Sequence, residues 1–256
     1  MFIPLKRPRD IARMRDAGRI VAEVFELLAE HIKPGVELSY LDASVEAHLK
    51  KYGASPLYKG YRGNPPTHPP FPGVICASVN EEICHGLPDN RALKEGDIVG
   101  IDIGLKYKGF CGDACKTFAV GQISPEAQRL LTVAQDCLRV GIEAAQYGNY
   151  LNDIGMDIHN YADLQEVSVV REWGGHGVGR SLHESPSVSH VRQVGRGLKL
   201  KPGMTFTIEP MINQGGYEWQ LLDDGWTVVT QDGQLSAQFE HTIAITTNGP
   251  EILTKL

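Results

Sequence analysis

Cysteine, aromatic residues and long apolar runs are scarce in this chain of 256 residues. The five cysteines are an odd number, so reduced thiols are expected rather than a disulfide framework. No stretch approaches the roughly 20 apolar residues that a membrane-spanning helix needs, and Met1–Asp10 has no apolar run typical of a secretory signal. We therefore expect a cytoplasmic protein.

The chain also lacks a strong charge of either sign. A formal net charge of −6 gives no overall attraction to nucleic acid or an anionic membrane, and direct binding to either is not expected. The first twenty residues are locally basic, which indicates a solvated helix face, with docking to an acidic partner as the alternative. Phosphate-binding glycine signatures are absent, so a nucleotide site is not predicted either.

Helical and strand patterns alternate in two similar rounds. Apolar residues at spacings of three and four predict a helix over 8–32, and a second is expected from an N-cap at Ser39 to Gly53. A third is predicted from Ser124 to about 146, and a fourth is expected to be capped by Asn152. Strands are predicted at 74–79, 97–105, 117–120, 204–212, 226–230 and 237–246.

These rounds match each other in sequence. Aligning Gly35 with Gly148 superposes the helix pairs, and aligning 93–102 with 200–209 superposes two strands, at nearly the same offset. We predict an α+β protein of one domain, 1–256, with pseudo-symmetric halves at about 8–120 and 121–250. A curved antiparallel sheet is expected, covered by helices on its outer face. The segment 60–73 holds five of the fifteen prolines and is predicted to be a stiff surface loop.

Five widely separated side chains carry the strongest chemical signal. They lie in apolar or glycine-bounded runs, where an uncompensated charge is costly: Asp102, Asp113, His176, Glu209 and Glu240. Asp102 and Asp113 flank a turn, so a hairpin would bring both carboxylates to one end. The alternative makes Asp113 a turn residue and pairs Asp102 with a lysine.

An oxygen-rich set with one imidazole and no thiolate favours Mn²⁺, Fe²⁺, Co²⁺ or catalytic Zn²⁺ over structural zinc. Four carboxylates carry too much charge for one divalent ion, so two ions are predicted. Cys111 and Cys115 suggest a zinc pair, but no second pair at suitable spacing supports it. His85 and His183 are candidates to hydrogen-bond a carbonyl or protonate a leaving nitrogen, with capping or core packing as the alternative.

Several short motifs in order resemble one known family. They are Ile101-Asp102-Ile103-Gly104, Gly112-Asp113, Gly175-His176-Gly177-Val178-Gly179, Leu182-His183-Glu184, Phe206-Thr207-Ile208-Glu209-Pro210, Asp224-Gly225-Trp226-Thr227 and Ser236-Ala237-Gln238-Phe239-Glu240-His241. Over essentially the whole chain they resemble the methionine aminopeptidases, whose pita-bread fold is shared with prolidase, aminopeptidase P and creatinase. Only 33 residues separate His176 from Glu209, which indicates type I.

The resemblance implies a division of roles. His176 and Glu209 would hold one ion, Asp102 the other, and Asp113 and Glu240 would bridge. Glu209 would also be the catalytic base, with His85 and His183 facing the substrate. Cys76, Phe71 and Trp226 would form the methionine side-chain pocket, with Leu182 where many members carry Phe.

The implied activity is removal of the initiator methionine from new polypeptides with a small second residue, by a hydroxide bridging two ions of Co, Mn, Fe, Zn or Ni. The expected partner is the N-terminal peptide substrate, together with a transient ribosome contact; we expect a monomer. An Xaa-Pro peptidase and a non-catalytic peptide-binding member of the same fold are the alternatives.

Overall fold

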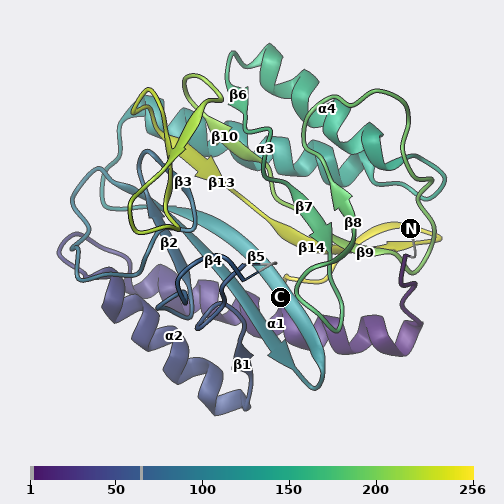
Figure 1. Ribbon diagram of the computed structural model, residues 1–256, viewed down its shortest axis with the longest axis horizontal. Helices are drawn as coiled ribbons and strands as arrows, with labels where there is room; N and C mark the ends of the chain where they lie inside the picture. Colours follow the sequence, from purple (N-terminus) through teal and green to yellow (C-terminus); the bar gives the residue numbers. More distant parts are fainter. Residues whose placement is uncertain (1–2, 64–65) are drawn as a thin grey trace.

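The computed structural model describes residues 3–63 and 66–256, and its four helices form two pairs. In Figure 1, α1 (Pro8–His31) and α2 (Leu38–Tyr52) lie along one side of the strands, and α3 (Pro125–Ala144) and α4 (Leu151–Leu164) lie along the other. The predicted positions are confirmed to within a few residues. Among the described residues, no helix has the length and apolar character to cross a membrane.

Local chemistry sets the helix ends. Pro8 opens α1, and the Ser124 hydroxyl accepts a hydrogen bond from the Ala127 amide at 3.1 Å to cap α3. The N-caps predicted at Ser39 and Asn152 are wrong, because α2 and α4 begin one residue earlier than those positions. Before α4, the Asp153 carboxylate accepts from the Tyr150 amide at 2.8 Å and supplies the missing partner.

In the described part of the chain, all strand pairings are antiparallel, and the strands form four hydrogen-bonded sheets. The first holds β1 (Ser55–Pro56), β2 (Cys76–Val79), β4 (Ile98–Tyr107) and β5 (Phe110–Ala119); the second holds β6 (Ser168–Val169), β10 (Met211–Asn213) and β13 (Ser236–Gln238). The third holds β3 (Glu82–Cys84), β11 (Trp219–Leu221) and β12 (Val228–Thr230); the last holds β7 (Gly175–Gly177), β8 (Glu184–Val188), β9 (Thr205–Ile208), β14 (His241–Thr246) and β15 (Gly249–Ile252). The α+β class with antiparallel strands and covering helices is confirmed.

Two long predicted strands are broken at the acids themselves. Pro210 has no amide hydrogen, and the Glu209 amide donates to His190 Nε2 at 3.1 Å instead of to a strand, so β9 stops and β10 begins in another sheet. The Glu240 amide, between β13 and β14, donates to the carbonyl of Cys115 on β5 at 2.8 Å. Both acids therefore sit where the chain passes from one sheet to another.

Each helix pair covers its own apolar core. One core joins α1 and α2 to β2, β4 and β5, and the other joins α3 and α4 to β9, β10, β13 and β14. The starts of α2 and α4 are 113 residues apart, and those of β4 and β9 are 107 apart, the offsets of the sequence repeat. An isolated bridge between Lys116 and Phe239 links β5 to the segment after β13.

Candidate metal centre and substrate pocket

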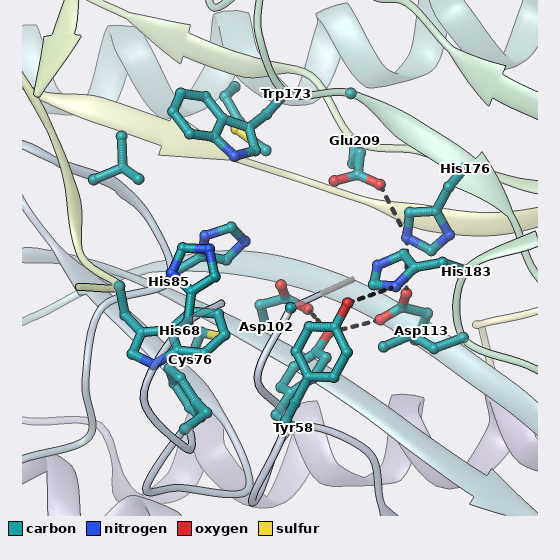
Figure 2. Close-up of a pocket in the computed structure, with 18 of the residues that line it drawn as sticks. Tyr58, His68, Cys76, His85, Asp102, Asp113, Trp173, His176, His183 and Glu209 are labelled. Atoms are coloured by element: carbon teal, nitrogen blue, oxygen red, sulfur yellow. Dashed lines mark hydrogen bonds and ion pairs between the residues drawn. The ribbon is translucent and has the colours of Figure 1, made fainter. Parts of the chain in front are cut away.

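A cavity of about 420 Å³ lies where the two helix-covered halves meet. All ten residues that the sequence predicted for the site line it: Phe71, Cys76, His85, Asp102, Asp113, His176, His183, Glu209, Trp226 and Glu240. Figure 2 shows His176, Glu209 and Asp113 on one side of the view and His85 and Cys76 on the other. One wall of the cavity therefore carries acids together with His176. The other wall carries His85 and the apolar cluster of Phe71, Cys76 and Trp226.

Asp102 and Asp113 reach the cavity from the β4–β5 hairpin. Asp113 lies opposite Gly104, two residues from Asp102, so strand alternation puts both carboxylates on one face. This confirms the hairpin prediction, and Asp113 lies inside β5 rather than in a turn. The Tyr58 hydroxyl contacts both carboxylates, at 2.6 Å from Asp102 Oδ1 and 2.8 Å from Asp113 Oδ1. One hydroxyl proton serves one acceptor, so the second oxygen needs a cation or another proton.

Gly104 makes room for Tyr58. A Cβ at this position would lie 2.7 Å from Tyr58 Cε1, closer than van der Waals contact permits. The absence of a side chain therefore lets the tyrosine ring lie over the hairpin and place its hydroxyl between the acids.

His176, on β7, presents a lone pair to two of the acids. Its Nδ1 is 3.1 Å from the Gly177 carbonyl, which can only accept, so Nδ1 carries the proton. Burial lowers the pKa of this imidazole, which favours the neutral ring. Nε2 then has no proton, yet it lies 3.4 Å from Asp113 Oδ2 and 3.7 Å from Glu209 Oε1. A cation among these three groups would satisfy all of them.

Glu209 and Glu240 complete this wall. Glu209 accepts from the Thr207 hydroxyl at 2.6 Å and from Gln238 Nε2 at 3.4 Å. Glu240 is 3% exposed, and its Oε1 has no hydrogen-bond partner, a costly state for a buried oxygen. Ligand atoms of Asp102, Asp113 and Glu240 lie within 4.8 Å of one another.

The electrostatics of this cluster also favour bound cations. Burial, with repulsion from neighbouring carboxylates, raises the pKa of Asp102, Glu209 and Glu240 well above the ordinary range. Burial likewise raises the pKa of Asp113 to about 7. Without positive charge these acids resist ionisation, whereas divalent ions would stabilise the carboxylates. The donor set therefore fits metal ions, and the orphaned Glu240 oxygen is a clear mark of that fit.

His85 and His183 lie beside the acids without joining them. Burial lowers the pKa of each to about 4, so both imidazoles are neutral near pH 7. The ring centroids of His183 and His176 are 4.3 Å apart, and Tyr61 Oη is 3.4 Å from His183 Nδ1. His85 takes the left-handed backbone conformation, φ 57°, after β3.

The apolar wall is built by three buried residues in mutual contact, Phe71, Cys76 and Trp226. The rings of Phe71 and Trp226 meet edge to face at 5.3 Å and 89°. Burial raises the pKa of Cys76 well above that of a free thiol. The side chain is therefore a protonated thiol, and it contributes apolar surface to this wall. Leu182 also lines the cavity.

Several contributors were not predicted. Tyr61 and His68 of the proline-rich segment line the cavity beside the predicted Phe71, so the description of 60–73 as a surface loop is incomplete; Asn64 and Pro65 lie outside the described residues. His190 meets Glu209 from 19 residues away. The aromatic residues among the prolines are a sequence signal that could have indicated a wall of the cavity. No sequence signal indicated the role of His190.

Replacing Tyr58 by Phe should weaken metal binding. The variant removes the hydroxyl that orients Asp102 and Asp113, and loss of such an outer-shell contact costs about 10–100-fold in affinity. Calorimetric titration of the metal-free protein with Mn²⁺ measures this, with Tyr61→Phe as the matched control. Equal affinity in both variants would contradict the orienting role of Tyr58.

Comparisons with known proteins agree on one family. Residues 12–247 match the model of metallopeptidase family M24. The chain is 48% identical over 255 residues to methionine aminopeptidase 1 of Bacillus subtilis (strain 168), covering 100% of each protein. It is 44% identical over 256 residues to the methionine aminopeptidase of Escherichia coli (strain K12), covering 99% of this chain and 94% of that protein.

Solved structures agree. The methionine aminopeptidase of Rickettsia prowazekii superposes with a TM-score of 0.94 at 41% identity, over 99% of this chain and 100% of the other. An Xaa-Pro dipeptidase from Bacillus anthracis gives a TM-score of 0.76 at 22% identity, with 98% and 62% covered, and shares the fold alone. The fold and the acidic site define a metal-dependent peptidase. The chain belongs to metallopeptidase family M24, and its full-length relatives are methionine aminopeptidases.

Proposed function

We propose that the chain removes N-terminal methionine from new polypeptides whose second residue is small. The observation that carries the proposal is the arrangement of the cavity: metal-type ligands form one wall, and the Phe71–Cys76–Trp226 cluster forms another. Methionine is a flexible, apolar side chain that suits an aromatic pocket. Full-length relatives at 44–48% identity are named methionine aminopeptidases.

Two divalent cations, held by Asp102, Asp113, His176, Glu209 and Glu240, would supply a water of lowered pKa and polarise the scissile carbonyl. His176 and Glu209 would hold one ion, Asp102 would hold the other, and Asp113 and Glu240 would contribute to both. Two contacts support this division: Asp113 Oδ2 lies near His176 Nε2, and Glu240 lies near Asp102. The ions would be drawn from Mn, Fe, Co, Ni and Zn.

Glu209 is the base that accepts a proton from the attacking water. Its Oε1 is anchored by Thr207 and its backbone by His190, so the carboxylate keeps a fixed direction. His183 donates a hydrogen bond to the developing oxyanion, and Glu209 passes the proton to the departing amide nitrogen, which His85 holds by a hydrogen bond. Both imidazoles are neutral, so they act here as hydrogen-bond donors rather than as permanent charges. The free α-amine of the substrate binds beside Asp102.

Residues 1–256 act as one domain formed by duplication of a half. The shared offsets of helices and strands support this, as does a site to which both halves contribute. We further infer a cytoplasmic monomer that contacts the ribosome transiently, since its substrates emerge there.

A peptide panel tests the proposed function. The metal-loaded protein is expected to release methionine from Met-Ala-Ser, to act far more slowly on Met-Pro-Ser, and to leave N-acetylated Met-Ala-Ser intact. Mass spectrometry of the products measures all three. Faster cleavage of Met-Pro-Ser would favour an Xaa-Pro peptidase, and metal binding with no cleavage would favour a non-catalytic peptide-binding protein.

A further inference from the structure

Trp226 is held from two directions. Its own turn fixes its backbone: Asp224 Oδ1 accepts hydrogen bonds from the amides of Trp226 at 2.7 Å and Thr227 at 2.8 Å. The proline-rich segment contacts its side chain directly, and the indole Nε1 donates to the Pro69 carbonyl at 2.9 Å. The buried N–H of the indole thereby gains the acceptor that it needs.

His68 makes the reciprocal contacts. Its Nδ1 lies 2.8 Å from the Gly225 carbonyl, and because a carbonyl only accepts, Nδ1 carries the proton and donates. Its ring lies against the indole of Trp226, with centroids 4.7 Å apart and planes at 31°. We call His68, Pro69, Gly225 and Trp226 the indole clamp.

The clamp joins segments that are far apart in sequence. His68 and Gly225 are 157 residues apart, and the backbone contact is close: a Cβ on Gly225 would lie 3.2 Å from Pro69 Cδ. The part of the proline-rich segment that carries His68 and Phe71 is itself fixed, since the His68 amide donates to the Arg62 carbonyl at 3.0 Å and the Phe71 amide to the Tyr61 carbonyl at 2.8 Å. Trp226 therefore packs against a segment whose backbone is held by its own hydrogen bonds.

Three further rings surround the indole: Phe71 at 5.3 Å, Tyr61 at 6.1 Å and His85 at 6.2 Å. Of the aromatic and imidazole neighbours, His68 has the shortest centroid distance, and it combines stacking with a hydrogen bond to the backbone of the same turn. Its ring nitrogen Nδ1 meets the carbonyl of Gly225, which precedes Trp226 in the chain.

We propose that His68 is a specificity-determining positioning residue, which acts through Trp226 to hold the side-chain pocket at the width of an unbranched methionine. This inference rests on the proposed function. The indole of Trp226 is fixed by stacking on His68, by its own hydrogen bond to Pro69 and by the hydrogen bond from His68 to Gly225. A pocket wall held in this way accepts the narrow methionine side chain, but it resists the widening that a branched leucine side chain requires. Releasing His68 lets the indole move and widens the pocket.

Steady-state kinetics of the metal-loaded full chain on Met-Ala-Ser and Leu-Ala-Ser test the proposal. His68→Ala is expected to raise KM for Met-Ala-Ser about tenfold, with kcat changing less than about threefold, and to lower the Met-to-Leu ratio of kcat/KM about tenfold. His68→Asn, which keeps an N–H donor near the Nδ1 position, should recover part of the loss. Pro70→Ala, exposed on the same segment, is the control.

A double-mutant cycle separates positioning from folding. In a Trp226→Ala background, His68→Ala should change neither KM nor the Met-to-Leu ratio further, because the residue through which it acts is gone. Unchanged kinetics for His68→Ala in active protein, or an equal effect in both backgrounds, would overturn the inference. Failure of the unmodified chain to release methionine would instead overturn the proposed function.

Discussion

Glu209→Gln should lower kcat for methionine release from Met-Ala-Ser by about 10²–10⁴-fold, the usual contribution of a general base. The amide keeps the shape of the side chain and loses the basic oxygen that Thr207 orients. Rapid-quench measurement of released methionine at saturating metal gives the rate. Because Glu209 is also a proposed ligand, the metal content of each sample is determined in parallel.

Thr207→Val provides the matched comparison. This variant keeps the carboxylate but removes a hydroxyl that donates to Glu209 Oε1 at 2.6 Å and accepts from the His176 amide at 3.0 Å. We expect a loss of about tenfold, far smaller than for Glu209→Gln. Full activity in Glu209→Gln with metal bound would show that another group takes the proton.

Metal removal should make stability strongly dependent on pH. In the metal-free protein, burial raises the folded-state pKa of Asp113 to about 7 from its ordinary value of 3.8. The folded state therefore holds a proton that the unfolded state releases, so stability is lost as pH rises from about 4 to about 7. At about 1.4 kcal/mol per unit, this carboxyl alone accounts for on the order of 4 kcal/mol.

Thermal unfolding of chelated and metal-loaded samples between pH 4 and 8 measures this loss. The melting temperature of the chelated protein should fall by on the order of 10 °C across the range, whereas the loaded protein should change little. Asp113→Asn supplies the control, since its amide cannot ionise and the chelated variant should lose less stability. A chelated protein whose melting temperature does not fall with pH would contradict the account of buried, uncompensated acids.

The acids could be predicted because their sequence context is anomalous. Asp102 and Glu209 stand in apolar runs that recur at a fixed offset, and such a pattern needs compensation wherever the strands lie. The breaks at Glu209 and Glu240 could not be predicted, because they depend on amide partners, His190 and Cys115, that only folding brings near.

The substrate wall was harder to predict from the residues alone. Phe71, Cys76 and Trp226 follow from the family resemblance, and the structure brings them into one cluster. The partners Tyr58 and His68 meet their targets across 44 and 157 residues of sequence. Residues that far apart in sequence form no periodic pattern, so these contacts become visible only in the folded structure.

The most direct test of the account is a titration of the chelated protein with Mn²⁺, following bound metal and methionine release from Met-Ala-Ser in the same samples. The account predicts no turnover in the metal-free protein, turnover that rises with occupancy, and saturation at two ions per chain. Turnover that persists in protein shown to be free of metal would contradict it.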